Sequence, residues 1–181
     1  MSSTRAALAA PLAVLVAIWI RLAWVHPLLP ARIPAHFGPA GQVDRWSDPG
    51  EFVLFNALFP AFVTAVMLGS ALLAVRLPAR WVNLPNREFW LAPERIEATR
   101  ARLLAHMATF ATLTLLLFAA VMEISLSVAR SGSARLPALF FWALGLYLAG
   151  MGFVVASLFR TFGRGAVERR RATESTGLRR G

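Results

Sequence analysis

The 181-residue chain contains no cysteine, and every one of its 19 basic residues is an arginine. Without cysteine there is no disulfide, no thiolate metal site and no cysteine nucleophile. Charged residues make up only 15% of the chain, against about 25% in soluble domains, whereas 57% is hydrophobic and the mean hydropathy is +0.59. These shortages predict an integral membrane protein with room for one compact bundle.

The common catalytic signatures are also missing. The chain has no phosphate-binding loop, no G-x-S-x-G, no H-E-x-x-H and no dinucleotide fingerprint. We therefore expect a protein that is not an enzyme and has no resident cofactor, leaving open a zinc or other divalent ion in one loop. The net charge of +10 comes from arginines beside apolar stretches, so we expect the lipid bilayer as a partner and no nucleic acid.

Four stretches are long and apolar enough to cross a bilayer, which takes about 20 residues. They cover residues 6–25, 52–75, 103–129 and 136–159 approximately. The sequence thus predicts an all-α, four-helix membrane bundle over residues 1–159. The arginine-rich remainder, residues 160–181, has few large apolar side chains and is predicted to be a disordered tail.

The arginines are distributed unevenly between the two sides. Fourteen lie near the termini or between the second and third spans, and five lie on the other side. Because arginine accumulates on the cytoplasmic side of membrane proteins, we expect both termini to be cytoplasmic in a multi-pass protein of the cell membrane. The loop Ile33–Trp46 should then face outward.

This outer loop carries two residues suited to chemistry, His36 and Asp44. Glycine and proline residues between them can fold the chain back so that the two side chains converge. The loop is therefore the predicted site for an external ligand or peptide. Its candidate residues are His36, Phe37, Gly41, Asp44 and Trp46.

A metal site in the same loop is an alternative interpretation. An imidazole and a carboxylate can share zinc or another divalent ion, but His36 and Asp44 alone are too few for a closed zinc site. A third ligand would come from His26, Asp48, Glu51 or Glu123. Asp48 and Glu51 have a simpler role, because Asp48-Pro49-Gly50-Glu51 is typical of a capped helix start. A purely structural loop is the third interpretation.

Two polar residues lie inside predicted spans at matching depths, Arg21 in the first and Glu123 in the third. A carboxylate in the bilayer is costly unless it is paired or neutralised. We expect an Arg21–Glu123 ion pair that fixes the packing of these spans. The alternative places Glu123 beneath the outer loop, as a proton carrier or metal ligand.

The loop between the second and third spans contains a second candidate surface, formed by Asn83, Pro85, Asn86 and Trp90. Residues 83–86 should form a turn, and Trp90 should enter the inner membrane interface. The surface is either a docking site for a cytoplasmic protein or a connector that fixes the helical hairpin. Pro93 should begin a helix that continues into the third span.

The outer loop also resembles a known family. Eight residues match the DUF1648 pattern position by position: Pro30, Ile33, Pro34, His36, Phe37, Gly41, Asp44 and Trp46. The resemblance covers about residues 12–66. Residues 83–95, with a turn, an aromatic pair and a proline-started helix, are similar to a segment of short, four-span DUF1648 proteins, which extends the match to about residue 105. The lysine that often follows the aspartate in the family is replaced here by Asp48-Pro49-Gly50.

DUF1648 also forms the N-terminal part of SdpI-like proteins, which act in toxin immunity and signalling, although the second half of this chain does not match their remaining portion. The resemblance implies an accessory, sensory or immunity-like membrane protein. Two alternatives stay open. One is a metal-dependent membrane enzyme or metal-binding protein that uses His36, Asp44 and Glu123; the other is a small transporter, which with four spans would act as a homo-oligomer.

Overall fold

The computed structural model describes residues 2–74, 77–78, 81, 84–163 and 165–168. Four helices in this part are long and apolar enough to cross a membrane, which confirms the predicted membrane bundle. They are α1 (Ser2–Val25), α2 (Pro49–Ala74), α4 (Ile96–Ser131) and α5 (Ala138–Phe162). The shorter elements are the 3-10 turn η1 (His26–Leu28), the strands β1 (Ile33–Phe37) and β2 (Val43–Ser47), and the helix α3 (Arg87–Trp90).

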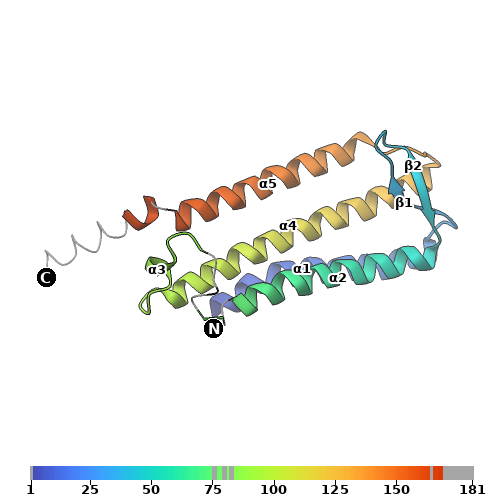
Figure 1. Cartoon of the computed structure of the whole chain (residues 1–181). Coiled ribbons are helices and arrows are strands. Elements are labelled where there is room, and N and C mark those ends of the chain that lie inside the picture. Colours follow the sequence, from blue (N-terminus) through green and yellow to red (C-terminus); the bar gives the residue numbers. More distant parts are fainter. Residues whose placement is uncertain (1, 75–76, 79–80, 82–83, 164, 169–181) are drawn as a thin grey trace, which may run out of the picture.

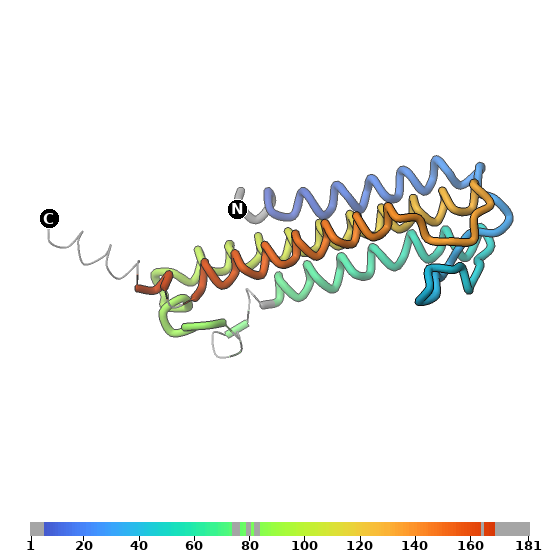
Figure 2. The backbone as a smooth tube through the Cα atoms, turned by 90° about the horizontal axis from the view of Figure 1, so that it is seen from above, coloured from blue at the N-terminus to red at the C-terminus, as the bar shows by residue number. Residues whose placement is uncertain are grey.

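Helix α4 is central to the bundle, because it packs against each of the other three long helices. Figure 1 shows α5 on one side of α4, with α1 and α2 on the opposite side. In the perpendicular view of Figure 2, α1 and α2 lie on either side of α4. The bundle is therefore a compact group of α1, α2 and α4, to which α5 is added along α4.

The two ends of the bundle differ. At one end, here named the hairpin end, the antiparallel strands β1 and β2 cover the ends of the helices (Figure 1). The start of α1 and the end of α5 lie at the opposite end, named the arginine-rich end because Arg95, Arg100, Arg102 and Arg160 lie near the helix ends there. The first and the last long helix thus have their outer ends on the same side of the bundle.

A buried cluster joins the hairpin to the helices. Ile33 of β1 has no exposed surface and packs with Leu22 and Val25 of α1, Phe52 of α2 and Leu126 of α4. The apolar first residue of the hairpin therefore anchors it in the core, and the polar residues that follow remain at the surface.

Two of the long helices extend beyond the apolar stretches read from the sequence. Helix α4 begins at Ile96, seven residues before the third apolar stretch and three after Pro93, which lies in a turn. Helix α5 ends at Phe162, and Ala166 and Val167 beyond it belong to a buried cluster with Leu84 and Trp90. Residues 169–181 of the predicted tail lie outside the described part, so its disorder stays a prediction.

The predicted ion pair between α1 and α4 is confirmed. Arg21 Nε lies 2.8 Å from Glu123 Oε1, and Arg21 Nη2 donates a hydrogen bond of 2.9 Å to Glu123 Oε2. The Arg21 guanidinium also lies 5.5 Å from the ring centre of Trp24, within range of a cation–π contact. Both carboxylate oxygens are thus satisfied by one guanidinium, the arrangement that makes an ion pair strong and geometrically specific.

Breaking this pair from one side should destabilise the bundle. Arg21→Met or Glu123→Met leaves one charge unpaired within a span, and each is expected to lower the free energy of unfolding by about 2 kcal/mol. The double variant removes both charges and should lose less than either single variant. Thermal unfolding in detergent measures this cycle, with Arg130→Met, an exposed arginine of α4, as a control expected to have no effect. Additive losses in the double variant would contradict the pairing.

Neighbouring leucines of α4 provide a test of its central position. Leu115 has no exposed surface, whereas Leu116 is 50% exposed. Leu115→Ala should leave a cavity between helices and cost on the order of 2 kcal/mol, while Leu116→Ala should cost almost nothing. Chemical denaturation of the two variants in the same detergent compares them directly, and equal losses would place the helix interface elsewhere.

Candidate functional site

The outer loop predicted from the sequence is a β-hairpin with two irregularities. Ile33 pairs with Ser47 and Pro34 with Trp46, but His36 then pairs with Arg45 and Phe37 with Val43. Each strand therefore contributes one extra residue, Ala35 in β1 and Asp44 in β2. Such bulges change the direction of side chains and are frequent at binding sites.

The tip of the hairpin is a tight turn. Gly38 N donates to Gln42 O (2.8 Å), and Gly41 N donates to Gly38 O (2.9 Å). Gly41 has a φ of +76°, a conformation that favours glycine. The predicted site residue Gly41 is thus required by the backbone geometry of the turn.

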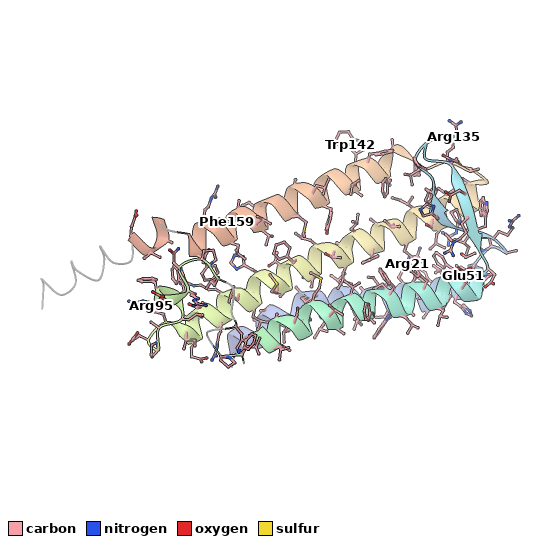
Figure 3. The ribbon with its side chains drawn as sticks, in the orientation of Figure 1. Arg21, Glu51, Arg95, Arg135, Trp142 and Phe159 are labelled. Atoms are coloured by element: carbon pink, nitrogen blue, oxygen red, sulfur yellow. The ribbon has the colours of Figure 1, made fainter. Side chains whose placement is uncertain are left out.

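The connection between α4 and α5 extends the hairpin on its β2 side. Val43 N donates to Ala134 O (2.8 Å), and Leu136 N donates to Gly41 O (2.7 Å), while Gln42 and Arg135 form an isolated antiparallel bridge. Figure 3 shows Arg135 beside the hairpin, just before the start of α5. The hairpin is therefore held by the core through Ile33 and by a second loop along β2.

The structure brings His36 and Asp44 together. His36 Nδ1 lies 2.6 Å from Asp44 Oδ1, and the two side chains are 65% and 41% exposed. A carboxylate accepts this hydrogen bond, so Nδ1 carries the proton; in the neutral ring Nε2 is then an acceptor. The bare Cα of Gly38 leaves room for the pair, because a Cβ there would lie 3.1 Å from Asp44 Oδ2 and still closer to Gln42.

Three other charged residues of the hairpin end have partners of their own. Arg45 Nη2 lies 3.3 Å from Glu51 Oε1. Asp48 Oδ1 accepts a 2.8 Å hydrogen bond from Glu51 N, which confirms the predicted cap of α2. The ion pair between Arg45 and Glu51 was not predicted, and the six-residue separation of opposite charges was its only signal in the sequence.

The two aromatic candidates, Phe37 and Trp46, are half-buried. The guanidinium carbon of Arg32 lies 5.6 Å from the ring centre of Trp46, so one face of this ring is engaged in a cation–π contact. Phe37 lies at the end of β1, next to His36. These rings flank the pair of His36 and Asp44 along the strands and complete the predicted set of site residues.

A small cavity of about 80 Å³ lies where the hairpin meets α2 and α4. Its polar side chains include Arg45, Ser47, Glu51, Asn56 and Ser125, and Pro34, Ala35, Phe52, Phe55, Val121 and Met122 complete the lining. The cavity adjoins the bulge at Ala35 and can accommodate one small polar group or ordered water.

The four residues considered as a third metal ligand do not join the pair. Glu123 binds Arg21, Glu51 binds Arg45 and Asp48 caps α2; His26 lies in η1. Within the described ranges, no group of three or more histidine, aspartate or glutamate side chains is placed to hold a metal ion. His36 and Asp44 thus offer two ligands.

The candidate residues of the inner loop are used within the chain itself. Asn86 Nδ2 and Trp90 Nε1 both donate to Phe162 O, at 3.1 and 3.0 Å, and Trp90 O accepts a 2.8 Å bond from Thr99. Trp90 is 2% exposed. This geometry agrees with the connector interpretation, because the loop binds the last turn of α5; Pro85 is exposed, and Asn83 lies outside the described residues.

Comparison with known proteins agrees with the resemblance seen in the sequence. Residues 13–59 match the family model of a domain of unknown function, DUF1648. An uncharacterized protein of Archaeoglobus fulgidus is 27% identical over 146 residues, which cover 76% of this chain and 79% of the relative. No solved structure matches the chain. The match includes the end of α1, the whole hairpin and the first part of α2, so the pair of His36 and Asp44 lies within the segment that is similar to DUF1648.

Proposed function

We propose that this protein is an accessory or sensory membrane protein that binds an external ligand at its hairpin end. The proposed ligand is a peptide or small molecule carrying an amine or another hydrogen-bond donor. One observation carries this proposal: an exposed, closely hydrogen-bonded pair of His36 and Asp44 (2.6 Å) on a hairpin held by both the core and a neighbouring loop.

The energetics of the pair favour a role in recognition. Exposed ion pairs contribute little to stability, about 0–1 kcal/mol, so folding alone does not account for the arrangement. Binding does benefit from it, because acceptor groups that are held in place before the ligand arrives lose less conformational entropy on binding. Nε2 of a neutral His36 and the Asp44 carboxylate are both acceptors, which matches a cationic or donor group on the ligand.

The proposal includes the orientation of the chain. The hairpin end would face outward and the arginine-rich end the cytoplasm, following the excess of arginine near the termini. The immunity-like role implied by the DUF1648 resemblance fits the same geometry, since a toxin peptide would meet the hairpin first. The protein is proposed to bind its ligand without chemical conversion.

Thermal stability with added ligands tests the binding site. The purified protein in detergent is titrated with short cationic peptides and, separately, with Zn²⁺. A ligand at about one hundred times its Kd should raise the Tm of the wild type by roughly 5–10 °C. His36→Gln and Asp44→Asn should abolish this rise, whereas His26→Gln, a histidine outside the pair, should retain it. Identical responses of all four proteins to every ligand would refute the proposed site.

The metal content of the purified protein distinguishes the proposed peptide site from the alternative in which His36 and Asp44 bind a metal ion. About one divalent ion per purified chain, lost in both His36→Gln and Asp44→Asn, would replace the peptide ligand by a metal. It would also favour the metal-binding protein or metal-dependent enzyme considered from the sequence. A metal-free wild type that still responds to cationic peptides supports the proposal as stated.

Orientation is measured with two single-cysteine variants, a simple design because the chain has no cysteine of its own. Ala40 at the tip of the hairpin and Glu88 in α3 are both exposed. In intact cells, Ala40→Cys should react with a membrane-impermeant thiol reagent, and Glu88→Cys should react only after lysis. The reverse pattern would place the hairpin in the cytoplasm.

A further inference from the structure

A second cavity, of about 400 Å³, lies at the arginine-rich end between α4 and α5. Arg102 and His106 of α4 and Arg160 and Thr161 of α5 line it, together with Trp90, Ala105 and Ala166. Its volume lies within the range of roughly 300–1,000 Å³ typical of ligand sites. We propose that this cavity binds the phosphodiester headgroup of an anionic lipid through Arg102 and Arg160.

The charge of the cavity fits a phosphate. Among the residues that the structure describes, its lining has two arginines on different helices and no carboxylate. Glu97, the nearest acidic residue along α4, is instead paired with Arg100 at 3.2 Å. Guanidinium groups bind phosphate oxygens in a bidentate manner, and two of them approaching from α4 and α5 can enclose one phosphodiester.

The other polar groups of the cavity hold its shape. His106 Nδ1 donates to Arg102 O (2.8 Å), and Ser157 Oγ lies 3.4 Å from Nε2 of the same ring, which links α4 to α5. Trp90 forms a buried wall fixed by its bond to Phe162 O. Thr161 adds a hydroxyl group that can donate to a phosphate oxygen.

The depth of the cavity matches that of a headgroup. Helix α4 has 36 residues and α5 has 25, and at 1.5 Å per residue α4 is much longer than the roughly 30 Å hydrocarbon layer. Arg102 is seven residues into α4, and Arg160 is two residues before the end of α5. Both therefore lie near the boundary where basic pockets between helices bind anionic lipids.

Lipid selectivity in native mass spectrometry tests the site. The full-length protein in detergent is mixed with phosphatidylglycerol or with phosphatidylcholine, and bound lipid is counted. We expect one phosphatidylglycerol to bind at least about tenfold more tightly than phosphatidylcholine. The double variant Arg102→Gln/Arg160→Gln should lose this preference. Arg130→Gln/Arg135→Gln, which removes the same charge at the hairpin end, should retain it.

The remaining outcomes are equally informative. An unchanged preference in Arg102→Gln/Arg160→Gln overturns the site, provided that its Tm shows a folded protein. If that variant fails to fold, Arg102→Lys/Arg160→Lys keeps the charge but not the bidentate geometry and should reduce the preference. A third outcome has two parts: the wild type shows no preference between the two lipids, and millimolar inorganic phosphate releases bound phosphatidylglycerol. This outcome would identify free phosphate as the ligand and overturn the lipid assignment.

Discussion

The central packing of α4 is the constraint on which the rest of the structure depends. This helix contacts α1, α2 and α5 along its length and also supports β1. It carries Glu123, whose ion pair fixes the rotation of α1 against α4. In a bilayer, close packing and polar contacts hold helices together, because lipid tails are as apolar as leucine. One bidentate pair within a span therefore has more influence on helix registration than the same pair would have in water.

The two ends of the bundle differ in how they satisfy the backbone hydrogen-bonding groups that helix ends leave unpaired. At the hairpin end, Asp48 caps α2, and strands and loop share their backbone hydrogen bonds. At the arginine-rich end, side chains bind a free backbone carbonyl, since Asn86 and Trp90 both donate to Phe162 O. The hairpin end consequently leaves polar side chains such as His36 exposed, whereas the loop at the arginine-rich end uses Asn86 and Trp90 within the chain.

Much of this arrangement could be predicted from the sequence, for reasons specific to particular residues. The apolar lengths predict four spans, and the matching depths of Arg21 and Glu123 predict their pair. Glycine and proline between His36 and Asp44 predict that the chain reverses. Other features depend on contacts between distant segments, which periodicity does not encode. The bond from Asn86 to Phe162 spans 76 residues, and the cavity of Arg102 and Arg160 exists only because α5 ends beside the start of α4.

The backbone hydrogen bonds between the hairpin and the connection before α5 have a consequence for how far the hairpin can act as a separate module. The DUF1648 match ends at residue 59, yet the β2 edge of the hairpin is completed by Ala134 and Leu136, which belong to the connection before α5. A fragment limited to residues 13–59, or a chimera that grafts this segment onto other helices, would carry every residue of the proposed ligand site. It would nevertheless expose an unpaired strand edge, the kind of surface at which chains aggregate.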